Sequence, residues 1–583
     1  MGVVVADAAE ATPPTSRPAL SDVLERLDDR LRGRLPALVV IVATAVGWVV
    51  RFDQDDGFIT YRYARNLSRG LGLVFNPGQR VQGYTSFLWA VVNAIPERFG
   101  WAPTTFGVWI GLPLLALSLF LTYRLSARFL ARRGQQLLAL VILAVNMTFL
   151  AYGTGGMETM LQTTLVLAVA VLLVPSNAQR QAGVGAWAAA GFLAGLALLT
   201  RLDSVLLVGS WFALALWAWI RRPGAERRLD AATLARVGAG GLAAAVLVVP
   251  WLVWTNDYYG SILPNTLAAK SGFSPVWRVG YGLLYLIAFF LSYGVFLLVP
   301  RLRDGWRRRA TLTTLVPLAV VTGVWFAYVL WAGADFMEFR FVVPVIPYLA
   351  ILGVVVIDPI TRHTRALLVT LVVVSALHRV VPTPPVPILS IYSLRGEIGS
   401  HAQLGRELHR WFARASPADE PVIAVSPLGA ISYYSDLPVV DMIGLVDPGI
   451  AKHAPKVRLY YPGHLQMASI PQLTSRHVSL VFGTLWPLDR VDRRKSYNIR
   501  ELTPVYPVVD LGELPTAARV IEIPDGRDRV FAAIQMKPDR RVDEVVRTQG
   551  LRTFPLDRSC RGSAPQSLGT RWVTFALGTR TCK

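Results

Sequence analysis

Long apolar runs separated by short polar segments fill the first two thirds of the chain. Eleven runs approach the ~20 residues that a helix needs to cross the hydrocarbon core of a bilayer. The predicted spans are 35–50, 104–123, 135–152, 157–174, 185–200, 203–220, 237–254, 281–299, 311–330, 341–357 and 366–380. The pattern therefore predicts a polytopic α-helical membrane protein with about 11 transmembrane helices. The composition agrees, since 53% of the 583 residues are hydrophobic and the mean hydropathy is +0.43.

Arginines gather in every second connection between these runs, and the other connections carry acids and aromatic residues. The arginine-rich positions are Arg26, Arg30, Arg32, Arg34, Arg124, Arg128, Arg132, Arg133, Arg221, Arg222, Arg227, Arg228, Arg301, Arg303, Arg307, Arg308 and Arg309. The positive-inside bias predicts a cytoplasmic tail at 1–34 and an exterior loop at 51–103. We expect a plasma-membrane location. The net charge of +21 then reflects topology, and nucleic-acid binding is not expected.

Two further segments are predicted beside the spans. The exterior loop contains helical patterns at 58–66 and 87–95, which we expect to lie along the bilayer surface within a transmembrane domain at 35–380. The Pro-rich stretch 380–387 then leads into an extracytoplasmic domain at 381–583, where a helical pattern precedes short β-branched runs. Such alternation predicts a soluble mixed α/β domain.

The two ends of the chain give separate expectations. The first 30 residues show no pattern of a cleavable signal, so the first span is expected to act as an uncleaved anchor. The only two cysteines, Cys560 and Cys582, fall in the predicted exterior, where an oxidising environment favours one disulfide between them.

Polar clusters outside the C-terminal domain all fall on the predicted exterior face. Asp53, Asp55 and Asp56 directly follow the first span. A charged side chain beside lipid is energetically unfavourable, so we expect these acids to have a function. The other members are Glu158, Arg201, Asp203, Asn256, Asp257, Tyr258, Tyr259, Pro264, Asn265, Lys270, Asp335, Glu338 and Arg340. Purely structural roles compete for some of them: an interfacial ion pair for Arg201 and Asp203, an aromatic belt for the tyrosines, and a charged turn at 335–340.

This mixture suits sugar transfer from a polyprenyl phosphate. A carboxylate can deprotonate an acceptor hydroxyl, and Arg or Lys can stabilise a departing phosphate. Aromatic rings can pack against sugars and prenyl chains. The chain has no Gly-rich nucleotide loop and no metal-spaced His/Cys set, so neither a metal nor another cofactor is expected.

Several motifs resemble GT-C glycosyltransferases, and most closely the actinobacterial terminal β-(1→2) arabinofuranosyltransferases. They are Asp55-Asp-Gly-Phe, Arg62, Arg65-Asn-Leu, Gly72-Leu-Val-Phe-Asn-Pro-Gly-Gln-Arg-Val-Gln-Gly-Tyr-Thr-Ser-Phe-Leu-Trp89, Gly155-Gly-Met-Glu158, Thr200-Arg-Leu-Asp203, Tyr258-Tyr-Gly-Ser-Ile-Leu-Pro-Asn-Thr-Leu-Ala-Ala-Lys270 and Gly333-Ala-Asp-Phe-Met-Glu-Phe-Arg340. The resemblance implies the GT-C fold and a decaprenyl-phosphoryl-arabinofuranose donor. It also implies an acidic base in the first exterior loop and a glycan acceptor such as arabinan. The chain has Gln82 and Gly83 where the family pattern has a Glu-containing variant, and Asp203 where a Glu is common, so the sugar stays open. The sequence does not determine whether the transfer inverts or retains the configuration.

We expect Asp55 as the general base, with Asp56 as the second choice. Asp56 and Glu158 would also hold sugar hydroxyls, and Arg201, Lys270 and Arg340 are phosphate candidates. Further substrate-binding candidates are Arg62, Asp203, Tyr258, Tyr259, Asn265, Asp335 and Glu338. A polyprenyl-phosphate-mannose-dependent transferase is the alternative enzyme. A lipid-linked sugar flippase fits less well, because it needs polar groups at mid-membrane, and a glycan-binding scaffold leaves the acidic pair unexplained.

Overall fold

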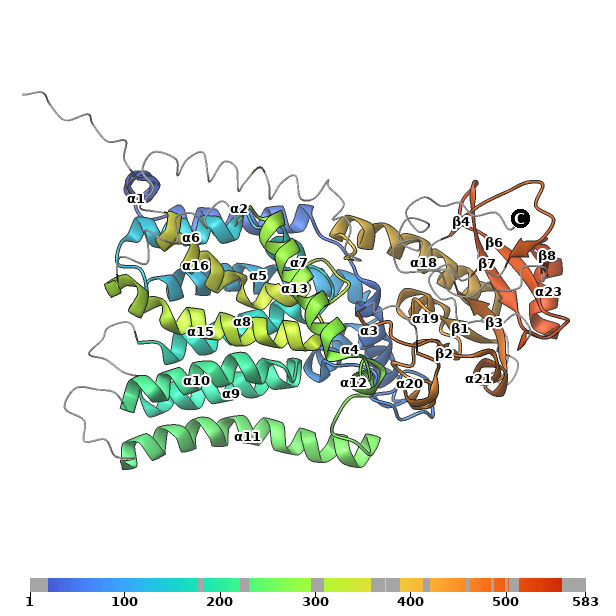
Figure 1. Ribbon diagram of the computed structural model, residues 1–583, viewed down its shortest axis with the longest axis horizontal. Coiled ribbons are helices and arrows are strands. Elements are labelled where there is room, and N and C mark those ends of the chain that lie inside the picture. The colour runs from blue at the N-terminus through green and yellow to red at the C-terminus, as the bar shows by residue number, and fades with distance from the viewer. Residues whose placement is uncertain are drawn as a thin grey trace, which may run out of the picture.

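The protein was analysed as a computed structural model, which describes residues 19–175, 182–220, 230–294, 309–357, 373, 388–412, 420–456, 462–483, 487–498, 502 and 513–557. A helical part comes first in the chain, and a mixed sheet with short helices follows it (Figure 1). The span predicted at 366–380, both cysteines and the strand pattern near 572–576 lie outside the described residues, apart from residue 373.

The helical part follows the predicted apolar runs closely. Its elements are α1 (Leu20–Arg30), α2 (Leu35–Val49), α3 (Asp55–Ser68), α4 (Phe87–Arg98), α5 (Pro103–Ser126), α6 (Arg133–Ala144), α7 (Met147–Tyr152), α8 (Thr159–Leu173), α9 (Val184–Thr200), α10 (Ser204–Ile220), α11 (Ala231–Tyr259), α12 (Asn265–Ala269), α13 (Pro275–Ser292), α15 (Arg309–Ala332), η2 (Arg340–Val345) and α16 (Ile346–Ile357). In Figure 1, α8, α9, α10, α11 and α15 lie side by side, and α3 runs across their ends.

The count of eleven spans is not confirmed. In the described part of the chain, four helices (α5, α11, α13 and α15) are long and apolar enough to cross a membrane. A fifth span is obtained if α1 and α2, which meet at a bend of 101°, are taken as one. The remaining apolar helices are shorter. The run predicted at 135–152 is broken because the Asn146 side chain accepts a hydrogen bond from the amide of Phe149 and so starts a new helix.

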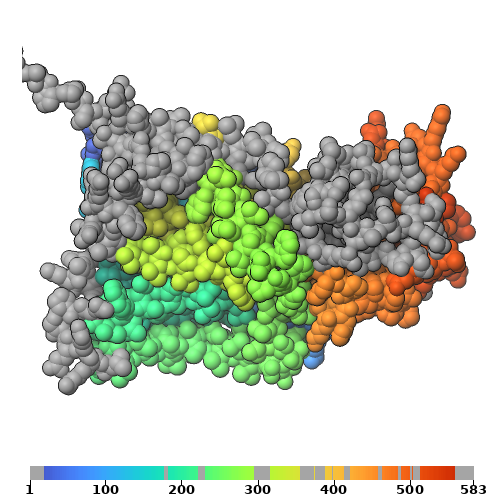
Figure 2. Space-filling model, viewed as in Figure 1, coloured from blue at the N-terminus to red at the C-terminus, as the bar shows by residue number. Residues whose placement is uncertain are grey.

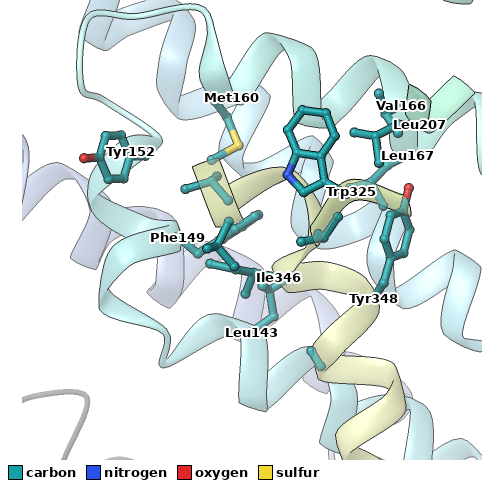
Figure 3. Close-up of a cluster of buried hydrophobic side chains, with 14 of the residues drawn as sticks. Leu143, Phe149, Tyr152, Met160, Val166, Leu167, Leu207, Trp325, Ile346 and Tyr348 are labelled. Carbon is teal, nitrogen blue, oxygen red and sulfur yellow. The ribbon is translucent and has the colours of Figure 1, made fainter. Parts of the chain in front are cut away.

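Large side chains from several helices form the core of the helical part. Figure 3 shows Trp325 of α15 and Tyr348 of α16 among apolar side chains from α6, α7, α8 and α10. Trp325 is 1% exposed and Tyr348 is fully buried. The Tyr348 hydroxyl accepts a hydrogen bond from the indole of Trp211, so the buried polar atoms of Tyr348 and Trp211 have a partner.

The C-terminal part contains α18 (Ile391–Phe412), short helices and one mixed sheet. Its strands are β1 (Val422–Val425), β2 (Val439–Asp441), β3 (Val478–Phe482), β4 (Leu488–Asp489), β5 (Tyr497–Asn498), β6 (Arg519–Pro524), β7 (Arg529–Gln535) and β8 (Arg552–Asp557), and its other helices are α19 (Ala430–Ser435), α20 (Pro448–His453), α21 (Ile470–Ser475) and α23 (Arg540–Thr548). The main strand order is β2-β1-β3-β7-β6-β8-β5, and β4 pairs with β7. β1 pairs in parallel with both β2 and β3, and β7 runs antiparallel to β3 and β6.

The 51–103 segment does not pack on the helices alone. Ile59, Tyr63 and Phe75 share one buried apolar cluster with residues of the sheet, including Ile423 and Phe531. The space-filling view is continuous from the helices to the sheet (Figure 2). The C-terminal sheet therefore helps to hold the segment that carries the acidic pair.

Candidate functional site

Asp55, the first residue of α3, is held by the C-terminal part. Its carboxylate accepts hydrogen bonds from the backbone amides of Gly429 (2.7 Å) and Ala430 (2.8 Å). His401 Nδ1 lies 3.6 Å from the same carboxylate. Burial raises the pKa of Asp55, but these partners outweigh it and leave the pKa below its usual value. Asp55 therefore connects α3 to the residues that begin α19.

The next residue, Asp56, has a different environment. Its Oδ2 lies 3.9 Å from Arg340 Nη1, and 29% of its side chain is exposed. Burial raises the pKa of Asp56 to about 6, although Arg340 and Lys270 act in the opposite direction. This carboxylate is partly accessible, and it changes its protonation state close to neutral pH. Both properties suit a general base.

Two cations and a second acid surround Asp56. Arg340 Nε pairs with Asp335 Oδ2 at 2.5 Å, and Arg340 Nη1 contacts the sulfur of Met157 at 3.2 Å. The Lys270 side chain is exposed. Among the described residues, its ammonium forms no ion pair and no hydrogen bond. The geometry thus leaves Lys270 available to an anion, while Asp335 fixes the guanidinium of Arg340.

The C-terminal part also reaches this group. The His464 ring contacts Phe336 edge to face, with 5.1 Å between ring centroids, and a side chain on Gly463 would meet Lys270 Cε at 3.7 Å. Burial lowers the pKa of His464 to about 4, so the ring is neutral at physiological pH. Together, Asp56, Lys270, Asp335, Phe336, Arg340 and His464 form what we call the Asp56 site.

Glu158, Arg201 and Asp203 form a separate ion-pair network. Arg201 donates to Glu158 (2.8 Å) and to Asp203 (2.6 Å), and Asp203 also accepts from Gln162 and Tyr328. The structural role considered from the sequence, an ion pair, is therefore present. Arg201 and Glu158 act on the pKa of Arg340 in opposite directions, so the network lies near the Asp56 site.

Most of the other predicted residues make structural contacts. Arg62 donates to the backbone oxygens of Phe75, Ser432 and Leu437, which ties α3 to the C-terminal part. Asn265 donates to the carbonyls of Gly444 and Leu445. These hydrogen bonds therefore join segments that are far apart in the sequence.

The same holds for three more candidates. Glu338 accepts from Thr148 and from the amide of Ile391 at the start of α18. Tyr259 donates to Leu73 O, and Tyr258 stacks on Trp254 with 5.1 Å between centroids. The structure does not bring these side chains into the Asp56 site.

Sequence reasoning missed His401, Gly429 and His464. The first two are polar or conformational partners of Asp55 that lie more than 340 positions away from it in the chain. The fragment Pro462-Gly-His464 gives one signal, because a Pro-Gly pair marks a turn directly before His464. Within the described residues, no group of three or more His, Cys, Asp or Glu side chains is placed to hold a metal ion.

Comparisons with known proteins match parts of the chain. A family model described as a domain of unknown function (DUF8728) matches residues 393–521. A terminal β-(1→2)-arabinofuranosyltransferase from Corynebacterium glutamicum is 28% identical over 361 residues, which covers 56% of this chain and 50% of that protein. Its counterpart from Mycobacterium tuberculosis is 29% identical over 367 residues, covering 54% and 55%. The chain spans about half the length of these curated relatives.

Solved structures were compared as well. ArnT from Cupriavidus metallidurans bound to undecaprenyl phosphate has a TM-score of 0.47 and 17% identity, covering 86% of this chain and 97% of that one. The archaeal oligosaccharyltransferase AglB from Archaeoglobus fulgidus has a TM-score of 0.38 and 10% identity, covering 85% and 74%. The sequence comparison confirms the resemblance seen in the motifs: this chain is similar to the terminal β-(1→2)-arabinofuranosyltransferases.

Proposed function

We propose that this protein is a multi-pass membrane glycosyltransferase of the GT-C type. It would transfer arabinofuranose from a polyprenyl phosphate, such as decaprenyl-phosphoryl-arabinofuranose, to a cell-envelope glycan such as arabinan. The active site would face the extracytoplasmic side, between a membrane domain at 35–380 and a soluble domain at 381–583. The similarity to arabinofuranosyltransferases supports the reaction type and the sugar.

The observation that carries the proposal is the pairing of one accessible carboxylate with two cations. Asp56 lies 3.9 Å from Arg340, and the unpaired ammonium of Lys270 is near enough to influence the pKa of Asp56. The sequence favours Asp55 as the base, but the Asp55 carboxylate is already engaged by two backbone amides and His401. We therefore assign the base to Asp56.

Each group then has one role in the reaction. Asp56 takes the proton from the acceptor hydroxyl as that oxygen forms a bond to the anomeric carbon of the sugar. The bond from the anomeric carbon to the phosphate oxygen breaks, and the polyprenyl phosphate leaves with the bonding electrons. Lys270 and Arg340 stabilise the charge that grows on the phosphate. These roles need no metal ion.

A transfer assay with the purified full-length protein tests the proposal. The donor is radiolabelled polyprenyl-phosphoryl-arabinofuranose, and the acceptor is a neutral arabinan oligosaccharide. We expect product with the wild type and a loss of about 10²–10⁴-fold in rate with Asp56→Asn. Asp257→Asn is the matched control, because Asp257 is an exposed carboxylate on α11 outside the Asp56 site.

The same assay separates the alternatives. Turnover with polyprenyl-phosphoryl-mannose and none with the arabinose donor would reassign the sugar. Full activity of Asp56→Asn would exclude Asp56 as the base. Absence of turnover with every lipid-phosphate sugar, from protein that is folded by thermal melting, would contradict the proposed reaction class.

A further inference from the structure

A cavity outside the Asp56 site lies where α2 ends, α5 begins and α18 passes. Its volume is about 340 Å³, within the range of small-ligand pockets. The side chains that matter here are Trp48, Arg51, Asp53, Thr105, Trp109 and Arg395. The site residues discussed above do not line it.

Asp53 brings a partly exposed carboxylate, a hydrogen-bond acceptor, to this cavity. Its Oδ1 atom is buried and, in the described part of the protein, has no hydrogen-bond partner, so a ligand hydroxyl would meet the exposed part of the side chain. Burial also raises the pKa of Asp53 to about 6, against the opposing effect of Arg51.

Two tryptophans supply flat apolar surface beside that acceptor. The Trp48 and Trp109 rings lie 5.6 Å apart at an angle of 48°, and they are 38% and 61% exposed. The Arg51 guanidinium lies 4.4 Å from the Trp48 ring centroid and donates to the Trp48 carbonyl. The cavity therefore combines ring faces with a carboxylate, two arginines and a hydroxyl.

The cavity is linked to the Asp56 site through one short segment. A side chain on Gly156 would come within 3.6 Å of Asp53 Oδ1, and the next residue, Met157, contacts Arg340. The cavity and the Asp56 site therefore adjoin the same segment.

We propose that this cavity is a subsite for a neutral glycan, and that it holds a sugar of the acceptor chain other than the one that reacts. Sugar rings present an apolar face, which packs on tryptophan, and hydroxyls, which bind carboxylate and arginine. The inference rests on the proposed function for the identity of the glycan. An acidic lipid headgroup is the competing occupant, because Arg51 and Arg395 line the cavity and attract a phosphate.

Binding without turnover tests the subsite. The full-length Asp56→Asn variant is placed in nanodiscs of zwitterionic lipid and titrated with a neutral arabinofuranose oligosaccharide in the absence of donor. We expect Trp109→Ala and Asp53→Ala, each added to this background, to raise the Kd by about tenfold. Trp101→Ala is the matched control, because Trp101 is 63% exposed and does not line the cavity, and its Kd should not change.

Two results would overturn the subsite. One is an unchanged Kd in both cavity variants. The other is a glycan Kd that the cavity variants do not change, together with phosphatidylglycerol binding in the cavity. Arg51→Gln would then weaken phosphatidylglycerol binding, and Asp53→Ala would tighten it. If the wild type transfers no sugar but these variants still weaken glycan binding, the proposed function fails and the glycan site stands. If transfer proceeds with an unchanged acceptor KM in Trp109→Ala, the function stands and the subsite fails.

Discussion

Gly429 and Asp55 touch backbone to backbone as well as through the carboxylate. A Cβ atom on Gly429 would lie 1.8 Å from the carbonyl oxygen of Asp55, far inside contact distance. The backbone φ of Gly429 is −75°, which any residue can adopt. Glycine is required here because α3 and the start of α19 approach so closely, and not because of a positive φ.

Gly429→Ala should separate these two segments. We expect the free energy of unfolding to fall by about 2 kcal/mol or more. The two atoms nearest to the added Cβ are the carbonyl oxygen and carbon of Asp55, which belong to the backbone and cannot rotate away. Thermal unfolding of the purified protein measures it. Gly396→Ala in α18 is the control: a side chain there meets nothing within 4 Å, and the change should be neutral or slightly stabilising. Equal melting temperatures for both variants would contradict the close approach.

The rate of sugar transfer should rise with pH through about 6. Asp56 acts as a base only when ionised, and burial raises its pKa to about 6. Below that pH the carboxyl is protonated, and kcat/KM should fall about tenfold for each pH unit. The measurement is a pH profile of kcat/KM. The Asp257→Asn control should keep the same profile, and a flat profile between pH 5 and 7 would rule out Asp56 as the titrating base.

Asp55 should affect the stability of the folded protein at a lower pH than the pH at which Asp56 affects the rate. Because its pKa is lowered in the folded protein, its contribution is complete above the unfolded value of about 4 and is lost as the pH falls through the folded pKa. The wild type should therefore melt higher than Asp55→Asn at pH 7, and the gap should narrow below pH 4. A gap that stays constant down to pH 3 would contradict the hydrogen-bonded role.

Arg62→Lys should destabilise the protein despite conserving charge. Arg62 is 2% exposed and satisfies several carbonyls from two distant segments, which a single ammonium cannot reach together. We expect a loss of about 2–3 kcal/mol in the free energy of unfolding. Arg69→Lys is the control, since Arg69 makes one exposed ion pair with Asp436 and should change stability by under about 0.5 kcal/mol.

Apolar runs predicted the helical part well because burial and membrane insertion both select them. The run at 157–174 corresponds to α8, and the helical patterns near 58 and 87 correspond to α3 and α4. Helices whose start or composition depends on polar residues were harder to predict. Asn146 splits one run into two helices. The α1 helix is amphipathic, with apolar residues at 20, 23, 24 and 27, and is therefore not a continuous apolar run.

The sequence singles out four of the six residues of the Asp56 site and misses Phe336 and His464. Asp56, Lys270, Asp335 and Arg340 follow from acids and cations that recur on one face of the chain. Asp55 and Asp56 have the same chemistry and are adjacent, so only their partners distinguish them. Those partners, Gly429 and Arg340, come from segments whose approach depends on tertiary packing.

The shared cluster of the 51–103 segment and the sheet also has a consequence for biosynthesis. Residues of α3 are made early, yet the strands that bury Ile59 and Tyr63 emerge from the ribosome hundreds of residues later. Until then, the apolar face of α3 lacks its cover and Asp55 lacks its amide partners. A chain that stops before β7 would already carry every acid and cation of the membrane part, but it would lack Phe531 and the other β7 residues that help to bury Ile59 and Tyr63.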